Sequence, residues 1–306
     1  MPALALDYRP RTLKEVRGNE TTIKALEAVL ARKVENIPHT IMLCGPSGCG
    51  KTTLARIIAR EIGCVGEDFV EMDIADFRGI ETARELRRNM NYRPMEGRCR
   101  VYLLDESHRL TSDAQEAMLK AFEDTPPHVY FILATTDPNK LKPTVRNRCT
   151  TFEVSPLSTR EMKGLLEEIL ALEKVKIPGA AMDAIVDNCL GSPRNALQLL
   201  EKIIDMDPAD MALAVEKTAA DQSQVIDLCR ALIKGEKWGV VAKILKGLEE
   251  QEPETVRHGV LGYCASILLK EDNKQAFLVA DSFRKPFYES GGKAGLILAC
   301  YEALNI

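Results

Sequence analysis

The chain has 306 residues, of which 28% are charged and 45% are hydrophobic, and its formal net charge is −4. This length allows two or three hydrophobic cores, and the composition is ordinary for a soluble globular protein. A chain that is acidic overall gives no global signal for nucleic-acid binding, so any such binding has to come from a local basic patch.

The first predicted elements are a helix, a strand and a second helix. Apolar residues at helical spacing predict a helix over Thr22–Lys33, with Thr21 or Thr22 as its cap. The apolar run Ile41–Cys44 has the length of one buried strand. Thr53–Ile62 has its apolar residues on one side, which predicts an amphipathic helix.

The turn between this strand and this helix has the spacing G-x-x-x-x-G-K-[ST]. Its glycines let successive N–H groups point at phosphate oxygens, and the new helix adds its positive end. Lys51 supplies a charge for the β- and γ-phosphates, and the Thr52 hydroxyl is placed to bind Mg²⁺. The order strand, turn, helix therefore predicts a nucleoside-triphosphate site. Its residues are Gly45, Pro46, Ser47, Gly48, Cys49, Gly50, Lys51, Thr52 and Thr53.

Four further strand candidates alternate with helices. The strands are predicted at Phe69–Asp73, Val101–Leu104, Val129–Ala134 and Thr150–Val154, and the helices at Glu81–Met90 and Ser112–Glu123, the latter capped by Thr111 or Ser112. This alternation predicts an α/β fold, a parallel sheet with helices on both faces. Ligands of such sheets bind at the carboxyl ends of the strands. The glycine-rich turn, Asp105-Glu106 and Thr135-Thr136 all fall at those ends.

Beyond Ser155–Ser158 only helical patterns remain. Three helices are predicted at Thr159–Leu172, Gly179–Asn188 and Pro193–Asp205, before a second break at Asp207-Pro208. The last hundred residues predict four to six amphipathic helices, among them Val225–Ile233, Gly239–Leu248 and Thr255–Leu269. The predicted layout is a nucleotide-binding domain (1–155), a small helical lid domain (156–206) and an all-helical C-terminal collar domain (207–306).

An acidic pair follows the apolar strand predicted at Val101–Leu104. Asp105 stands where a carboxylate holds Mg²⁺ through water, and Glu106 can polarise an attacking water as a general base. Thr136 ends the neighbouring strand, where its hydroxyl could orient that water or sense the γ-phosphate. The alternatives are a solvated turn for the acidic pair and a simple strand-end cap for the threonine.

Two arginines are candidates for contacts with the nucleotide. Arg148, in VRNRC, lies too far along the fold to reach its own site easily but could reach a neighbour's. Arg194, in GSPRNALQLL, opens a helix of the second domain that can swing over the nucleotide. The alternative for both is an ordinary surface arginine.

These motifs together resemble a known family. The chain is similar to clamp-loader ATPases of the AAA+ class, both the gamma/tau subunit of bacterial DNA polymerase III and the small subunits of replication factor C. The motifs are Tyr8-Arg9-Pro10 with Glu15-Val16 and Gly18, Arg78-Gly79-Ile80, Asp105-Glu106-Ser107-His108, Ala114-Gln115-Glu116-Ala117, Ala134-Thr135-Thr136-Asp137-Pro138, Asn147-Arg148-Cys149 and Gly191-Ser192-Pro193-Arg194 with Ala196-Leu197. The resemblance is continuous over residues 5–205 and only architectural beyond.

The resemblance implies a role for each matching residue. ATP and Mg²⁺ would be bound, and ATP hydrolysed, by Lys51, Thr52, Asp105 and Glu106, with Tyr8, Arg9 and Pro10 on the adenine side. Thr136 would be sensor 1, Arg194 sensor 2 and Arg148 an arginine finger supplied in trans to the next subunit. Gln115 resembles the residue that couples the DNA-facing helix to the catalytic glutamate.

The sequence departs from the family at two places. The usual S-R-C is Asn147-Arg148-Cys149 here, which keeps the arginine and its implied role. The gamma/tau subunit carries a four-cysteine zinc insertion, where this chain has only Cys64, so we expect no zinc. This absence and the short C-terminal part favour a phage-like or replication-factor-like subunit.

A basic stretch within this acidic chain predicts where DNA binds. Between positions 78 and 100 there are seven arginines against three glutamates, although such a run is often only a solvated face. Helix N-termini bind phosphates without reading bases. We therefore expect DNA at two neighbouring helix starts, with the end of the first helix, near Met90 and Tyr92, as a weaker candidate for the clamp contact. The expected DNA contacts are Arg78, Gly79, Ile80, Arg84 and Ser112.

The resemblance implies an ATP-driven subunit that opens a sliding clamp and closes it on primer-template DNA. It would work in a ring of several copies with a distinct partner, most simply a pentamer. The alternatives are a scaffold subunit that never hydrolyses ATP, another AAA+ remodeller for recombination or helicase loading, and a small-molecule P-loop kinase. Nine cysteines without a C-x-x-C pair, no signal-peptide pattern and no apolar run of ~20 residues predict a cytoplasmic protein with no membrane partner.

Overall fold

The computed structural model describes residues 4–74, 79–248, 251, 253–269, 272–287 and 292–305. The chain forms two compact units, Met1–Ala212 and Leu213–Ile306. The candidate site lies in the first unit, which is built around a parallel sheet.

The sheet has five parallel strands in the order β2-β3-β4-β1-β5. All five predicted strands are confirmed, at β1 Thr40–Cys44, β2 Phe69–Asp73, β3 Arg100–Asp105, β4 Val129–Thr135 and β5 Thr150–Glu153. Two of the three inner strands, β1 and β4, are buried along their whole length, whereas the edge strand β2 is only partly buried. Their continuous apolar runs fit burial on both faces of the sheet.

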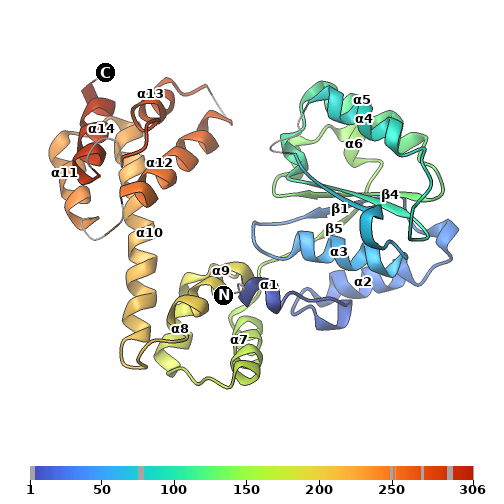
Figure 1. The fold of residues 1–306 in the computed structure, drawn as a ribbon, viewed down its shortest axis with the longest axis horizontal. Helices are drawn as coiled ribbons and strands as arrows, with labels where there is room; N and C mark the ends of the chain where they lie inside the picture. The colour runs from blue at the N-terminus through green and yellow to red at the C-terminus, as the bar shows by residue number, and fades with distance from the viewer. Residues whose placement is uncertain are drawn as a thin grey trace. The chain divides into compact units, whose positions relative to one another are not determined.

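Helices cover both faces of the sheet (Figure 1). On one face pack α2 (Glu20–Leu30) and α3 (Lys51–Glu61), and on the other α4 (Ile80–Asn89), α5 (Ser112–Glu123) and the short α6 (Pro143–Arg146). Each face has its own apolar cluster, with Ile57 and Leu103 in the first and Phe131 and Met118 in the second. The α/β class predicted from the alternating pattern is confirmed. Short helices connect these elements: α1 (Leu4–Asp7) and the 3-10 turns η1 (Leu13–Glu15), η2 (Val34–Asn36), η3 (Gly66–Asp68), η4 (Ser107–Arg109) and η5 (Pro138–Lys140).

Some helix boundaries differ from the prediction. The cap predicted at Thr21 or Thr22 is wrong, because α2 begins at Glu20 after Asn19, whose backbone is left-handed with φ 54°. The Thr22 hydroxyl instead donates to the carbonyl oxygen of Glu153 at 2.7 Å. The predicted cap of α5 is confirmed as Thr111, whose hydroxyl accepts the N–H of Ala114.

Three more helices complete the first unit: α7 (Thr159–Glu173), α8 (Gly179–Asn188) and α9 (Pro193–Ile203). All three predicted helices are confirmed, although α9 ends two residues earlier than predicted. A capping box of Ser158 and Glu161 starts α7. Pro193 in the first turn of α9 fits a position that needs no N–H partner, and it fixes where Arg194 stands.

The second unit contains helices only, among the residues that the structure describes. They are α10 (Met211–Lys234), α11 (Trp238–Gly247), α12 (Pro253–Leu268), α13 (Lys274–Ser282) and α14 (Lys293–Asn305). Their core includes Leu228, Val260, Phe283 and Cys300. The helix predicted over Val225–Ile233 is the last part of the 24-residue α10. Across the described ranges, no helix combines the length and apolar character needed to cross a bilayer.

A buried carboxylate, Asp68, fixes the segment between α4 and β3. Asp68 is fully buried and accepts the backbone N–H groups of Met95, Glu96 and Gly97, each at 2.8 Å. Arg100 also donates to it, at 3.2 Å. Burial raises the pKa of Asp68, but these hydrogen bonds outweigh burial and lower its pKa to about 2.

Replacing this carboxylate should destabilise the fold in a pH-dependent way. Because the folded pKa lies below the ordinary 3.8, the charged form stabilises the fold above about pH 4, and this contribution is lost as the pH falls toward 2. Asp68→Asn should lower the free energy of unfolding at pH 7 by roughly 2 kcal/mol. It should also flatten the loss of stability between pH 4 and 2. Urea unfolding followed by far-ultraviolet circular dichroism measures both, with the exposed Glu67→Gln as the matched control. An unchanged pH dependence in Asp68→Asn would contradict the role given to this carboxylate.

Candidate nucleotide site

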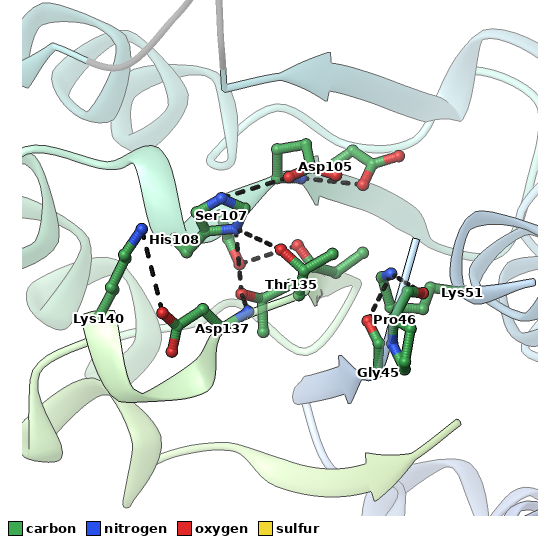
Figure 2. A network of polar contacts seen from close by, with 12 residues as sticks. Gly45, Pro46, Lys51, Asp105, Ser107, His108, Thr135, Asp137 and Lys140 are labelled. Carbon is green, nitrogen blue, oxygen red and sulfur yellow. Dashed lines mark hydrogen bonds and ion pairs between the residues drawn. The ribbon is translucent and has the colours of Figure 1, made fainter. Parts of the chain in front are cut away.

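The glycine-rich loop runs from the end of β1 into α3, and its lysine is turned inward. Lys51 is 6% exposed, and its Nζ donates to the carbonyl oxygens of Gly45 and Pro46 at 2.8 Å each (Figure 2). Burial lowers the pKa of Lys51, while the carboxylates of Glu106 and Asp105 oppose this shift. An ammonium group has three donors, and one remains for a phosphate oxygen. The loop therefore holds a cation at the place where a triphosphate would need it.

Close packing explains two glycines of this loop. A Cβ at Gly45 would lie 1.9 Å from the carbonyl oxygen of Val154, just after β5. A Cβ at Gly48, whose φ is +74°, would lie 2.2 Å from the Ser192 hydroxyl oxygen, which caps α9. Larger residues at either position would push the loop away from β5 or from α9. The loop thus needs glycine to fit between these elements.

The two predicted magnesium ligands lie next to each other. Thr52 lies in the first turn of α3, which follows β1, and Asp105 ends β3, two strands away from β1. The Thr52 hydroxyl nevertheless donates to Asp105 Oδ2 at 2.7 Å. Oxygen ligands of this kind suit Mg²⁺, which keeps several of its waters when bound through one or two carboxylates. The donor set therefore fits a Mg²⁺ ion bound together with a triphosphate.

Glu106 stands beside this pair in an unusual backbone conformation. Its φ is 53°, in the left-handed region that costs a non-glycine residue about 1–2 kcal/mol. Its N–H donates to Asp105 Oδ1 at 2.9 Å, and its carboxylate lies 3.4 Å from His108 Nε2. Residues with a strained backbone persist where many surrounding contacts hold them, and such residues cluster at active sites. Glu106 lines a small polar cavity of about 50 Å³ with residues of the loop and with Arg194.

A larger, mostly apolar cavity of about 350 Å³ adjoins the loop. Tyr8, Arg9 and Pro10 line it on one side, and Pro193 and Arg194 of α9 line it on another. Its volume falls within the range of small-molecule sites. The Tyr8 hydroxyl donates to Glu173 of α7, and this hydrogen bond raises the pKa of Tyr8. Burial, followed by the positive charge of Arg56, lowers the pKa of Arg9. Both cavities are lined by Arg194 of α9 and by the loop residues Gly48, Gly50 and Thr53, so Arg194 lies where the apolar cavity meets the phosphate loop.

The predicted sensor lies at the end of β4. Thr136 is exposed, and its hydroxyl lies 3.5 Å from His108 Nδ1, while the buried Thr135 hydroxyl lies 3.3 Å from the same nitrogen (Figure 2). The ring of His108 thus separates both threonines from Glu106. The sensor role of Thr136 stays a prediction.

Arg148 and Gln115 make their contacts away from Glu106. Arg148 pairs with Glu123 of α5 and donates to the Thr144 carbonyl oxygen at 3.0 Å, and it lines neither cavity. The Gln115 amide donates to the carbonyl oxygens of Leu110 and Lys140 and accepts the N–H of Lys142. Gln115 therefore holds the segment after η4 against the start of α6, and its hydrogen bonds among the described residues do not include Glu106.

Four of the five predicted DNA contacts are described, and Arg78 lies outside the described residues. Gly79 precedes α4 without a side-chain cap, so the first N–H groups of α4, starting at Ile80, receive no side-chain partner from that position. Arg84 is exposed and pairs with Glu81 at 2.6 Å. Ser112 is exposed at the start of α5, and α5 packs against α4.

Two residues of the basic stretch are turned inward. Arg100 pairs with the buried Asp68, so it adds no charge to an outer face. Met90, predicted near a clamp contact, is 3% exposed and packs in the core with Leu86, so that part of the prediction is wrong. Tyr92, 66% exposed, and Met95, 77% exposed, are the large apolar side chains exposed in the described segment after α4.

Sequence reasoning gave no role to His108, Glu123 or Asp68. His108 belongs to the motif that begins with Asp105. It follows this strand-ending aspartate by only three residues, which could have indicated that its side chain lies near the carboxyl ends of the strands. Glu123 ends a helix, and no local pattern connects it to Arg148, 25 residues further along.

The chain is similar to several known proteins. Residues 69–158 match the family model "DNA polymerase III, delta subunit", and residues 12–98 match "Magnesium chelatase, subunit ChlI". The chain is 32% identical over 265 residues to the DNA polymerase III subunit tau of Escherichia coli, covering 79% of this chain and 41% of that protein. It is 35% identical over 219 residues to the subunit gamma of Buchnera aphidicola, covering 65% of this chain and 60% of that protein.

A solved structure shows the same fold. The RuvB Holliday junction branch migration motor of Thermotoga maritima superimposes with a TM-score of 0.58 at 25% identity, covering 71% of this chain and 78% of that one. The chain spans about two fifths of the length of most of the curated relatives that it matches. With the sheet, the phosphate loop and the acidic pair in place, the chain is an AAA+ protein that resembles the clamp-loader subunits of DNA polymerase III.

Proposed function

We propose that this chain is the ATPase subunit of a sliding-clamp loader, which uses ATP to open a ring-shaped clamp and to place it on primer-template DNA in the cytoplasm. One observation carries the proposal. Lys51, Thr52, Asp105 and Glu106 converge on one polar cavity, in a chain similar to gamma and tau subunits. The convergence favours hydrolysis over a scaffold that only binds nucleotide.

Each residue of the site would have a separate role in ATP hydrolysis. Lys51 and the loop N–H groups would bind the β- and γ-phosphates, and Thr52 and Asp105 would hold Mg²⁺, which neutralises the charge that develops on the phosphates. Glu106, beside this pair, would take a proton from the attacking water. Arg194, at the start of α9, would contact the phosphates and so link their presence to the position of α7–α9.

Arg148 would complete the site of a neighbouring subunit. It is half-exposed and bonded to Glu123, so it is available to a partner once that ion pair opens. An exposed ion pair contributes less than about 1 kcal/mol, so its loss would be a small part of the energy of assembly. The helical second unit would hold the subunits together, in a ring of several copies with a distinct partner and without zinc.

DNA would bind along the starts of α4 and α5. The uncapped start of α4 and the exposed start of α5 suit phosphates, and Tyr92 with Met95 offers an apolar contact to the clamp. Each helix has one acidic residue in its first turn, Glu81 in α4 and Asp113 in α5, but only in α4 is that carboxylate paired with an arginine, Arg84.

Neutralising Arg84 should weaken DNA binding and its salt dependence. Each lost phosphate contact reduces the slope of log K against log salt by about 0.9, so Arg84→Ala should lower both affinity and slope. It should also reduce the DNA-stimulated ATPase while leaving the basal rate unchanged. Fluorescence anisotropy with primed DNA at several salt concentrations measures this effect. Arg32→Ala is the control, because Arg32 is exposed just after α2. Unchanged affinity and slope would place the DNA elsewhere.

The fold similarity to the RuvB motor supports a second candidate, a remodeller of branched DNA. The higher identity to gamma and tau subunits favours the clamp loader. ATP turnover of the assembled protein with primed DNA, four-way junctions or no DNA separates the candidates. Stimulation by primed DNA is expected. Stimulation by junctions alone would favour the remodeller, and no turnover at all would favour a scaffold.

A further inference from the structure

The imidazole of His108 lies beside Thr135 at the end of β4 (Figure 2), and the other side of its ring faces the carboxylate of Glu106. Its side chain is 11% exposed, with Nε2 3.4 Å from Glu106 Oε2. On the other side of the ring, Nδ1 lies 3.3 Å from the Thr135 hydroxyl oxygen and 3.5 Å from that of Thr136. The ring therefore contacts both the candidate general base and the strand end next to it.

The Thr135 hydroxyl on one side of the His108 ring and the Glu106 carboxylate on the other favour a proton on Nε2. The Thr135 hydroxyl oxygen accepts the N–H of Asp137 at 3.1 Å, so its own proton is free to be donated to His108 Nδ1. Nδ1 is then an acceptor, and the proton of a neutral ring is on Nε2. There it faces the carboxylate of Glu106, which accepts hydrogen bonds only when ionised.

The surroundings keep this ring neutral. Burial lowers the pKa of His108, although the carboxylate of Glu106 opposes that shift. The other charged groups that act on it are Lys140, Arg109 and Asp137. The 3-10 turn η4, which contains His108, is held against β4, because the Ser107 hydroxyl donates to the Ala134 carbonyl oxygen at 3.0 Å. The carboxylate of Glu106 is about one third exposed, so it is less enclosed than the ring of His108.

We infer that His108 is a positioning residue for ATP hydrolysis, donating from Nε2 to Glu106 while the hydroxyls at the end of β4 hold its ring from the Nδ1 side. The inference rests on the proposed ATPase function and deepens it. Movement of the β4 end, where Thr136 faces solvent, would move the imidazole and with it the general base. His108 would thus connect the strand-end threonines to the carboxylate that activates water.

Three substitutions separate positioning from packing. The amide of Gln reaches the position of Nε2, whereas the amide of Asn reaches only the position of Nδ1. His108→Gln should keep ATP turnover within about threefold, while His108→Asn and His108→Ala should lower kcat on the order of 10- to 100-fold. The dissociation constant for ATP should not change in any variant. Turnover is measured on the full chain, at concentrations where the rate per subunit no longer rises.

A second measurement tests the ring without ATP hydrolysis. Nitrogen-15 NMR of the imidazole groups distinguishes Nε2–H from Nδ1–H tautomers, and the signal of His108 is the one missing from His108→Gln among the four histidines. The neutral Nε2–H tautomer is expected. The Nδ1–H tautomer would overturn the inference, whatever the activity.

The turnover rates of the three variants also test the positioning role of His108. Unchanged kcat in His108→Ala, or equal losses in His108→Gln and His108→Ala, would overturn the positioning role while leaving the ATPase proposal intact. Absence of turnover in the unmutated chain, with normal ATP binding, would instead overturn the proposed function itself.

Discussion

Glu106→Gln should lower ATP turnover by about 10²–10⁴-fold while the chain still binds ATP with its normal affinity, since general base catalysis has this magnitude. The amide keeps the shape of the side chain but cannot accept a proton from the attacking water. Lys51, Thr52 and Asp105 are untouched, so the contacts expected to hold the triphosphate remain. Single-turnover kinetics and equilibrium binding of labelled ATP measure the two effects separately.

Glu61→Gln is the matched control, because Glu61 is an exposed carboxylate at the end of α3. It should turn over ATP like the unmutated chain. If Glu106→Gln also retained its rate, another group would have to be the general base.

Arg148→Ala should reduce ATP turnover of the assembled protein by about 10³-fold or more, by analogy with arginine fingers, and leave ATP binding nearly intact. The guanidinium is bonded to Glu123 and lines neither cavity of its own subunit. Its effect should therefore appear at the site of a neighbour. Arg146→Ala, at the end of the short helix α6 that precedes Arg148, is the control, since Arg146 is bonded to Asn139.

Mixing variants tests this sharing of sites. Lys51→Ala subunits keep a normal Arg148, and Arg148→Ala subunits keep a normal phosphate loop, so mixed interfaces should recover part of the activity. Recovery that depends on the mixing ratio supports an arginine supplied in trans. Normal turnover of Arg148→Ala alone, or a larger loss in Arg146→Ala, would refute the assignment.

Local patterns predicted most of the fold, and tertiary contacts account for the differences. The strands were found because their apolar runs are continuous, as burial on both faces of a parallel sheet requires. The start of α2 was missed because it depends on Asn19, whose amide bonds to the backbone of Ser155 in both directions. A residue 136 positions away fixes that turn, and no periodicity within the helix reveals it.

In the candidate site, too, some residues could be predicted from local sequence patterns and others depend on distant parts of the chain. The phosphate loop follows a fixed spacing, so its residues could be named from the sequence. The position of His108 depends on its contact with Thr135, 27 residues later. The position of Asp68 depends on hydrogen bonds from the backbone of residues 95–97. The burial of Met90 depends on how α4 packs against the sheet, which the basic pattern around it does not show.

The most direct test of the central claim is transfer of a sliding clamp from the same source onto nicked circular DNA, followed by gel filtration. With the assembled protein, the account predicts that labelled clamp moves with the DNA only when ATP is present. Lys51→Ala in every copy should abolish this transfer. Transfer that proceeds without nucleotide or with Lys51→Ala, or no transfer by the unmutated protein despite normal ATP turnover, would contradict the account.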